Sequence, residues 1–175
     1  MRSAAVALLV IAVLLPIAAG QTPLDKTLES QLKRVFPGAT AFSAKQASPV
    51  PHYVVYTGNP ASQTIAGYAF WTTELEPLER GYDGPIKILV GLDLNAHLTG
   101  VLVTENHEPY GYFSVDTPEF AAQFKGKDIR DPFKVGGDVA AISRASISVN
   151  SSSRAIRNGA RRVARAMLTP GGTAK

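Results

Sequence analysis

A serine-rich segment near the end of the chain, Ile142 to Ser148, combines the residue types that bind a phosphate group. It supplies alternating hydroxyls, small neighbours and one guanidinium, and we expect a helix to begin shortly after it. The N-terminus of a helix favours a dianion through its free N–H groups and its dipole. The candidate phosphate contacts are Ser143, Arg144, Ala145, Ser146 and Ser148. A serine-rich strand and loop without a ligand is the alternative that composition alone favours.

A second segment, residues 81–86, reads Gly-Tyr-Asp-Gly-Pro-Ile. Glycines on both sides of Tyr82 allow the backbone to approach a flat molecule, with the tyrosine ring as one wall. The candidate contacts are Gly81, Tyr82, Gly84 and Pro85. For this segment by itself, a turn that enters a strand is the plainer interpretation.

A third segment, residues 105–111, places several hydrogen-bonding side chains at the end of a predicted strand, before a Pro-Tyr-Gly loop. A heteroaromatic ligand with donors and acceptors on its rim could be held by Glu105, His107 and Glu108. A polar loop tip without a ligand explains the same residues equally well.

Several classes of chemistry are excluded by what the sequence lacks. It has no Gly-x-Ser-x-Gly elbow, no Gly-x-x-x-x-Gly-Lys loop and no His-Glu-x-x-His motif. Because it has no cysteine, it cannot form disulfides, thiolate metal sites or a cysteine nucleophile. His52, His97 and His107 lie on separate segments and make a poor set of metal ligands. The formal net charge of +4 is modest, so nucleic-acid binding is not indicated.

The elements that must position these segments follow from hydrophobic periodicity and turn residues. The predicted strands are 53–56, 65–71, 86–92 and 98–105, and the short connection 93–97 predicts an antiparallel hairpin. The predicted helices begin at Thr22-Pro23, at Thr117-Pro118 and at the cap Ser151-Ser152-Ser153, and end near Val35, Gly126 and Leu168. The sequence therefore predicts an α+β fold: an antiparallel twisted sheet with an N-terminal, a middle and a C-terminal helix.

The first 20 residues have the layout of a secretory signal peptide. Arg2 supplies a positive charge, residues 4–19 are apolar, and small residues precede a cleavage point after Gly20. An uncleaved membrane anchor is the alternative, although the apolar run is shorter than the roughly 20 residues that a spanning helix needs. We predict export to the periplasm or another extracytoplasmic space, a domain at 21–168 and a flexible tail at 169–175.

In their order and spacing, the three segments resemble the FMN-binding domain of bacterial respiratory membrane complexes. That family includes flavin subunits of the sodium-pumping quinone reductase, and the likeness is strongest to the extracytoplasmic domain of the nitrous-oxide-reduction regulator. That domain has a Gly-Tyr-x-Gly-Pro-Ile entry, a strand pair, a Glu-x-x-Glu-Pro or His-x-Glu-like loop, and a Ser-Gly-Ala-Thr or Ser-Arg-Ala-Thr element before a final helix. The resemblance runs from Leu24 to Leu168.

The resemblance implies where the cofactor is attached. In that family a separate magnesium-dependent flavin transferase, with FAD as donor, joins FMN through its phosphate to the last hydroxyl of the Ser-Gly-Ala-Thr element. Ser146 stands at that position here, and Arg144 stands at the glycine position. The aspartate that the family usually carries six residues before the acceptor is Ala140 in this chain, with Asp138 two positions earlier.

The implied function is electron transfer by FMN, as a carrier or as a subunit of a redox system rather than as a stand-alone enzyme. The expected partners are the flavin transferase and a membrane or extracytoplasmic redox protein. Tyr82 and its glycines would border the flavin ring, and the 105–108 side chains would contact its edge or the ribityl chain. Two alternatives remain: a non-redox ligand-binding or regulatory module of the same fold without covalent flavin, and a noncovalent flavin reductase.

Five arginines on the last predicted helix raise a separate question about partners. They are either a solvated face or a docking surface for an acidic redox protein or an anionic membrane, where charge raises the association rate. The residues are Arg154, Arg157, Arg161, Arg162 and Arg165.

Overall fold

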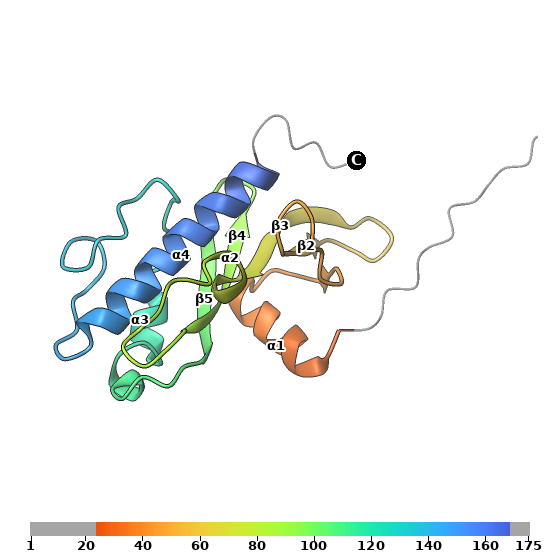
Figure 1. The fold of residues 1–175 in the computed structure, drawn as a ribbon. Coiled ribbons are helices and arrows are strands. Elements are labelled where there is room, and N and C mark those ends of the chain that lie inside the picture. Colours follow the sequence, from red (N-terminus) through yellow and green to blue (C-terminus); the bar gives the residue numbers. More distant parts are fainter. Residues whose placement is uncertain (1–23, 169–175) are drawn as a thin grey trace, which may run out of the picture.

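The computed structural model describes residues 24–168, so the predicted signal peptide and C-terminal tail lie outside it. A five-stranded antiparallel sheet with the strand order β1-β2-β3-β4-β5 forms the centre of the domain (Figure 1). The strands are β1 (Ala41–Phe42), β2 (Tyr53–Thr57), β3 (Thr64–Trp71), β4 (Lys87–Asp93) and β5 (Leu98–Glu105). The predicted α+β fold class and the 93–97 hairpin are confirmed.

Two longer helices and three short ones accompany the sheet (Figure 1). They are α1 (Lys26–Val35), α2 (Thr72–Leu75), the 3₁₀ turn η1 (Gly111–Phe113), α3 (Pro118–Ala122) and α4 (Ser146–Met167). The predicted N-terminal, middle and C-terminal helices correspond to α1, α3 and α4.

The core has two layers because successive strand residues point to opposite faces of the sheet. Phe70 and Val90 belong to a cluster that contains the buried face of α4, whereas Ala69 and Leu89 belong to a second cluster that contains α1. The two long helices therefore cover opposite faces. The α4 residues predicted to form its apolar face, Ile156, Ala160, Val163 and Ala164, are buried there, and Met167 packs at its edge.

Close approach of helix to sheet depends on small residues at two points. A Cβ added at Gly159 of α4 would lie 2.8 Å from the Phe70 ring, and one at Gly91 of β4 would lie 2.6 Å from the Val35 carbonyl oxygen. The Thr99 hydroxyl donates to the same Val35 oxygen at 2.6 Å. These contacts hold both long helices directly against β3, β4 and β5.

The start of the C-terminal helix was predicted wrongly, and the error bears on the candidate site. The helix begins at Ser146, after the N-cap residue Ala145, and the Ser151–Ser153 run lies inside it. These three serines are almost fully buried, because small side chains let the helix approach its neighbours. The serine run therefore serves packing rather than capping.

Of the other two predicted helix starts, the one of α1 is corrected and the one of α3 is confirmed. Thr22 and Pro23 lie outside the described residues, and α1 starts at Lys26 with Asp25 as its cap, whose carboxylate accepts from the amides of Thr27 and Leu28. The Thr117 cap of α3 is confirmed, because its hydroxyl accepts from the Phe120 amide at 3.1 Å.

Candidate functional site

A cavity of about 580 Å³ opens where two loops meet the N-terminus of α4. One loop precedes β4, and the other follows β5. This volume lies within the range of small-molecule sites, roughly 300–1,000 Å³. The lining residues are Tyr82, Pro109, Tyr110, Arg144, Ala145, Ser146, Ile147 and Ser148. Three predicted segments, far apart in the sequence, thus meet at one cavity.

Glu108 joins these three segments from behind the cavity. Its side chain is buried, and its carboxylate accepts from the backbone amides of Tyr82 at 2.9 Å and Asp83 at 3.0 Å. The Ser148 hydroxyl of α4 donates to the same carboxylate. A Cβ at Gly81 would lie 2.4 Å from a Glu108 carboxylate oxygen, so this glycine makes the close approach feasible. Glu108 therefore organises the site without lining it.

The loop after β5 is fixed by its own polar contacts. The Asn106 carboxamide oxygen accepts from the Glu108 amide at 3.0 Å, and its nitrogen donates to the Asp116 carboxylate at 2.5 Å. The Ser114 hydroxyl donates to the Tyr110 carbonyl at 2.7 Å. This loop thus presents Pro109 and Tyr110 to the cavity from a constrained backbone.

The N-terminus of α4 provides an anion site at the cavity wall. The cap residue, Ala145, has no side chain that could accept from the first amides of the helix. Those N–H groups are a site of partial positive charge, which an anion can satisfy. Arg144 adds a cation at the cavity lining. Its backbone is left-handed, with φ +66°, a conformation that suits glycine better.

The serines of this segment differ in how accessible their hydroxyls are. Ser148 is buried, and its hydroxyl is committed to Glu108. Ser146, the first residue of α4, is exposed and lines the cavity, whereas Ser143 is exposed but does not line it. Of these three, Ser146 is thus the only one that combines an accessible hydroxyl with a place at the anion site.

The remaining predicted site residues are distributed around the cavity. Gly81, Gly84 and Pro85 lie in the loop that carries Tyr82 and shape it, since the Gly81 amide donates to the Gly84 carbonyl at 2.7 Å. Glu105 and His107 are exposed and do not line the cavity. Glu105 instead lies 3.9 Å from the Lys87 ammonium.

Sequence reasoning missed three of the lining residues, Pro109, Tyr110 and Ile147. Tyr110 carried a usable signal, because it belongs to the Pro-Tyr-Gly end of the third segment. Ile147 carried no such signal in the sequence. Its side chain is 55% exposed because α4 begins at Ser146, and not at the serine run where the helix was predicted to begin.

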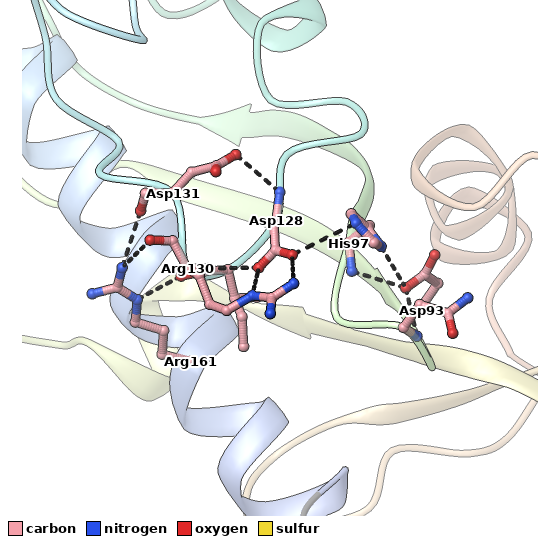
Figure 2. Close-up of polar contacts among 8 residues, drawn as sticks. Asp93, His97, Asp128, Arg130, Asp131 and Arg161 are labelled. Carbon is pink, nitrogen blue, oxygen red and sulfur yellow. Dashed lines mark hydrogen bonds and ion pairs between the residues drawn. The ribbon is translucent and has the colours of Figure 1, made fainter.

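The other end of α4 is held by polar contacts that are separate from the cavity. Figure 2 shows Arg161, whose guanidinium donates to the carbonyls of Ile129 at 2.6 Å and Asp131 at 3.0 Å. Beside it, the Asp128 carboxylate accepts from Arg130 and lies 3.7 Å from His97 (Figure 2). The hydrogen bonds from Arg130 hold the pKa of the Asp128 carboxyl well below its usual range.

Two further arginines of the last helix form ion pairs with the loop that precedes β4. Arg154 pairs with Glu79 at 2.9 Å and Arg162 with Glu76 at 3.2 Å. The arginines with these contacts attach α4 to neighbouring segments, so they are partly committed within the domain.

Two other kinds of site are absent from residues 24–168. In this range no three or more His, Cys, Asp or Glu side chains gather as metal ligands would. Within the same range, no helix is long and apolar enough to cross a membrane.

The fold and the site together define a small α+β domain that presents an anion site beside an aromatic-lined cavity. Residues 81–161 match the model of the FMN-binding domain family, which is the family that the sequence motifs predicted. The match covers both loops of the cavity and most of α4. No curated protein matches the chain.

The residues at the cavity fit the chemistry of FMN. The uncapped amides of α4 and Arg144 suit its phosphate, and Tyr82 and Tyr110 offer aromatic faces to its ring.

Proposed function

We propose that the protein is an extracytoplasmic electron-transfer protein that carries FMN, attached through its phosphate to the Ser146 hydroxyl. The observation that carries this proposal is the position of Ser146: its accessible side chain stands at the uncapped start of α4, inside the cavity of an FMN-binding domain. A phosphate on this oxygen would lie beside the first helix amides and Arg144, which stabilise its negative charge.

The attachment is a phosphoryl transfer by a separate flavin transferase. The Ser146 oxygen forms a bond to the FMN phosphorus of FAD, the bond between the two phosphates breaks, and AMP leaves while the serine proton passes to a base of the transferase. No oxidant or reductant is consumed. This chain has to present the hydroxyl, and the exposed first turn of α4 does so.

Bound FMN supplies one- and two-electron chemistry, and the chain supplies its placement. Arg144 is the only charged side chain among the residues that line the cavity. The Glu108 carboxylate, which contacts the lining residue Ser148, already accepts hydrogen bonds from three donors. The lining therefore has no carboxylate or imidazole that could transfer protons to a second substrate. This supports a carrier rather than a stand-alone enzyme.

The proposal also includes export of the protein from the cytoplasm and electron exchange with partner proteins outside it. The first 20 residues have the layout of a signal peptide, and covalent attachment would retain FMN outside the cytoplasm, away from its supply. The electron donor and acceptor would be membrane or extracytoplasmic redox proteins. The α4 arginines are weak candidates for docking them, since Arg154 and Arg162 already form ion pairs within the domain.

Ala140 is the position where the chain departs from its family's attachment motif. It is exposed, and its amide donates to the Gln123 side chain at 2.6 Å. Asp138 is committed to its own turn, because its carboxylate accepts from Lys127 and from the amides of Phe133 and Lys134. We therefore infer that Asp138 does not replace the family aspartate, and that Ala140→Asp increases the fraction of protein that carries flavin.

The experiment that tests the electron-transfer proposal starts from the exported protein, co-expressed with a flavin transferase and purified. We expect visible flavin absorbance that disappears on reduction with dithionite and returns in air. Ala140→Asp should give more absorbance per protein, and Gln123→Ala, which keeps residue 140 unchanged, should not. A colourless protein in both forms would contradict the proposal and favour a non-redox module of the same fold.

A further inference from the structure

Two tyrosines from different loops line the cavity together. Tyr82 lies in the loop before β4, and Tyr110 lies at the end of the loop after β5. Glu108 links their backbones, because its carboxylate accepts from the Tyr82 amide at 2.9 Å and it stands two residues before Tyr110. The two aromatic side chains are thus attached to one hydrogen-bonded support.

The two rings differ in how they are held. Tyr110 is 43% exposed and packs against Phe113, with ring centroids 5.3 Å apart. Tyr82 is 70% exposed, and no ring contact of its side chain is found within residues 24–168. Aromatic side chains with so much exposed surface beside a cavity are typical of binding sites for flat ligands.

We propose that Tyr110 and Tyr82 contact the isoalloxazine ring of FMN in this cavity, with Tyr110 as the braced wall that sets the position of the ring. This inference rests on the proposed function and adds Tyr110 to it. Offset stacking on a tyrosine suits an electron-poor heteroaromatic ring, and Phe113 packs against the Tyr110 ring.

Contact with tyrosine has an optical consequence that does not depend on turnover. In such a contact the tyrosine phenol would donate an electron to the photoexcited flavin and take it back, so the excited state would decay without emitting light and without net chemical change. A flavin in contact with both tyrosines should therefore be weakly fluorescent, and removal of either ring should restore emission.

Tyr112 is a matched control for this experiment. It is 74% exposed, packs against the same Phe113 with ring centroids 5.0 Å apart, and does not line the cavity. Tyr110→Leu and Tyr112→Leu thus remove the same ring from the same turn, but only the first removes a cavity wall.

The test compares flavin-loaded wild type, Tyr82→Leu, Tyr110→Leu, Tyr110→Phe and Tyr112→Leu at equal flavin absorbance. We expect wild-type emission far below that of free FMN and a several-fold increase in both leucine variants at 82 and 110. Tyr112→Leu should behave as wild type. Tyr110→Phe, which keeps the stacking face but is a poorer electron donor, should emit more while it keeps the wild-type visible circular dichroism of the flavin.

Each outcome decides the inference. Wild-type emission in both Tyr110 variants would overturn the role of Tyr110, even if Tyr82→Leu emits more. An equal increase in Tyr112→Leu would also overturn it, because a general loosening of the turn would then be the cause. If even the wild type carries no flavin, the proposed function fails and the role of the two tyrosines fails with it. A flavin-loaded wild type with unchanged emission in the Tyr110 variants overturns only the role of Tyr110, so the two failures are distinguishable.

Discussion

The Ser148 hydroxyl of α4 donates to the Glu108 carboxylate, forty residues earlier in the chain. Both side chains are buried, and the same carboxylate accepts from the amides of Tyr82 and Asp83. One side chain therefore fixes both cavity loops relative to the helix that carries Ser146.

Glu108→Ala removes the acceptor of three hydrogen bonds in a buried place. We expect a loss of about 3 kcal/mol in the free energy of unfolding, since each buried donor left without a partner costs about 1–3 kcal/mol and water will satisfy part of the deficit. Urea denaturation measures it. Glu105→Ala, three positions away and exposed, is the control and should change stability by less than about 0.5 kcal/mol. Equal effects of the two substitutions would contradict the role assigned to Glu108.

Gly81→Ala tests the approach of the loop to Glu108. The added methyl would lie 2.4 Å from a carboxylate oxygen that is held in place by its other donors. We expect the unfolding temperature to fall, because the clash destabilises the folded state by about 1–3 kcal/mol. Gly38→Ala is the matched control, because its Cβ would have no heavy atom within 4 Å. If both variants unfold at the same temperature as wild type, the packing around Gly81 is not as described.

Arg144 combines a useful charge with an unfavourable backbone conformation. Its φ of +66° costs an ordinary residue about 1 kcal/mol relative to glycine. Arg144→Gly should therefore unfold at the same or a higher temperature than wild type, whereas Arg144→Ala keeps the strain. Both variants lose the cation and should carry less flavin after the same co-expression. A large destabilisation by glycine would show that the side chain, not the backbone, governs this turn.

Asp138 gives a dependence of stability on pH. Burial raises the pKa of its carboxyl, but hydrogen bonds from Lys127 and from the amides of Lys134 and Phe133 outweigh it, so the net pKa is lowered. A lowered pKa in the folded state means that the stabilisation is present above the pKa of the unfolded chain, and is lost as the pH falls through the folded value.

Urea unfolding of wild type and Asp138→Asn between about pH 3 and pH 7 tests this sign. The variant should be less stable near neutral pH by about 1 kcal/mol, and the difference should shrink as the pH falls below about 4. A difference that stays constant across this range would contradict the role of the charged carboxylate.

The sheet and its hairpin could be predicted because their signals are local: alternating β-branched and aromatic residues, with turns between them. The Thr117-Pro118 cap is equally local, and it was predicted correctly. The start of α4 could not be found in this way. Ser151–Ser153 has the composition of a cap, and only burial against the rest of the fold shows that it lies inside a helix.

The candidate site shows the same difference between local signals and tertiary packing. Ser146, Arg144 and Tyr82 could be named from residue type and order, and all three line the cavity. The place of Glu108 behind the cavity could not, because it depends on the approach of Gly81 and on the depth of Ser148. Sequence patterns indicate which residues carry chemistry, whereas tertiary packing decides which of them face the ligand.

The attachment of FMN to Ser146 can be measured by the intact mass of the exported protein after co-expression with a flavin transferase. We expect a mass gain equal to FMN minus one water. This gain should be lost in Ser146→Ala and retained in Ser143→Ala, whose hydroxyl lies outside the cavity lining. The same gain in Ser146→Ala, or no gain in wild type together with no flavin absorbance, would contradict it.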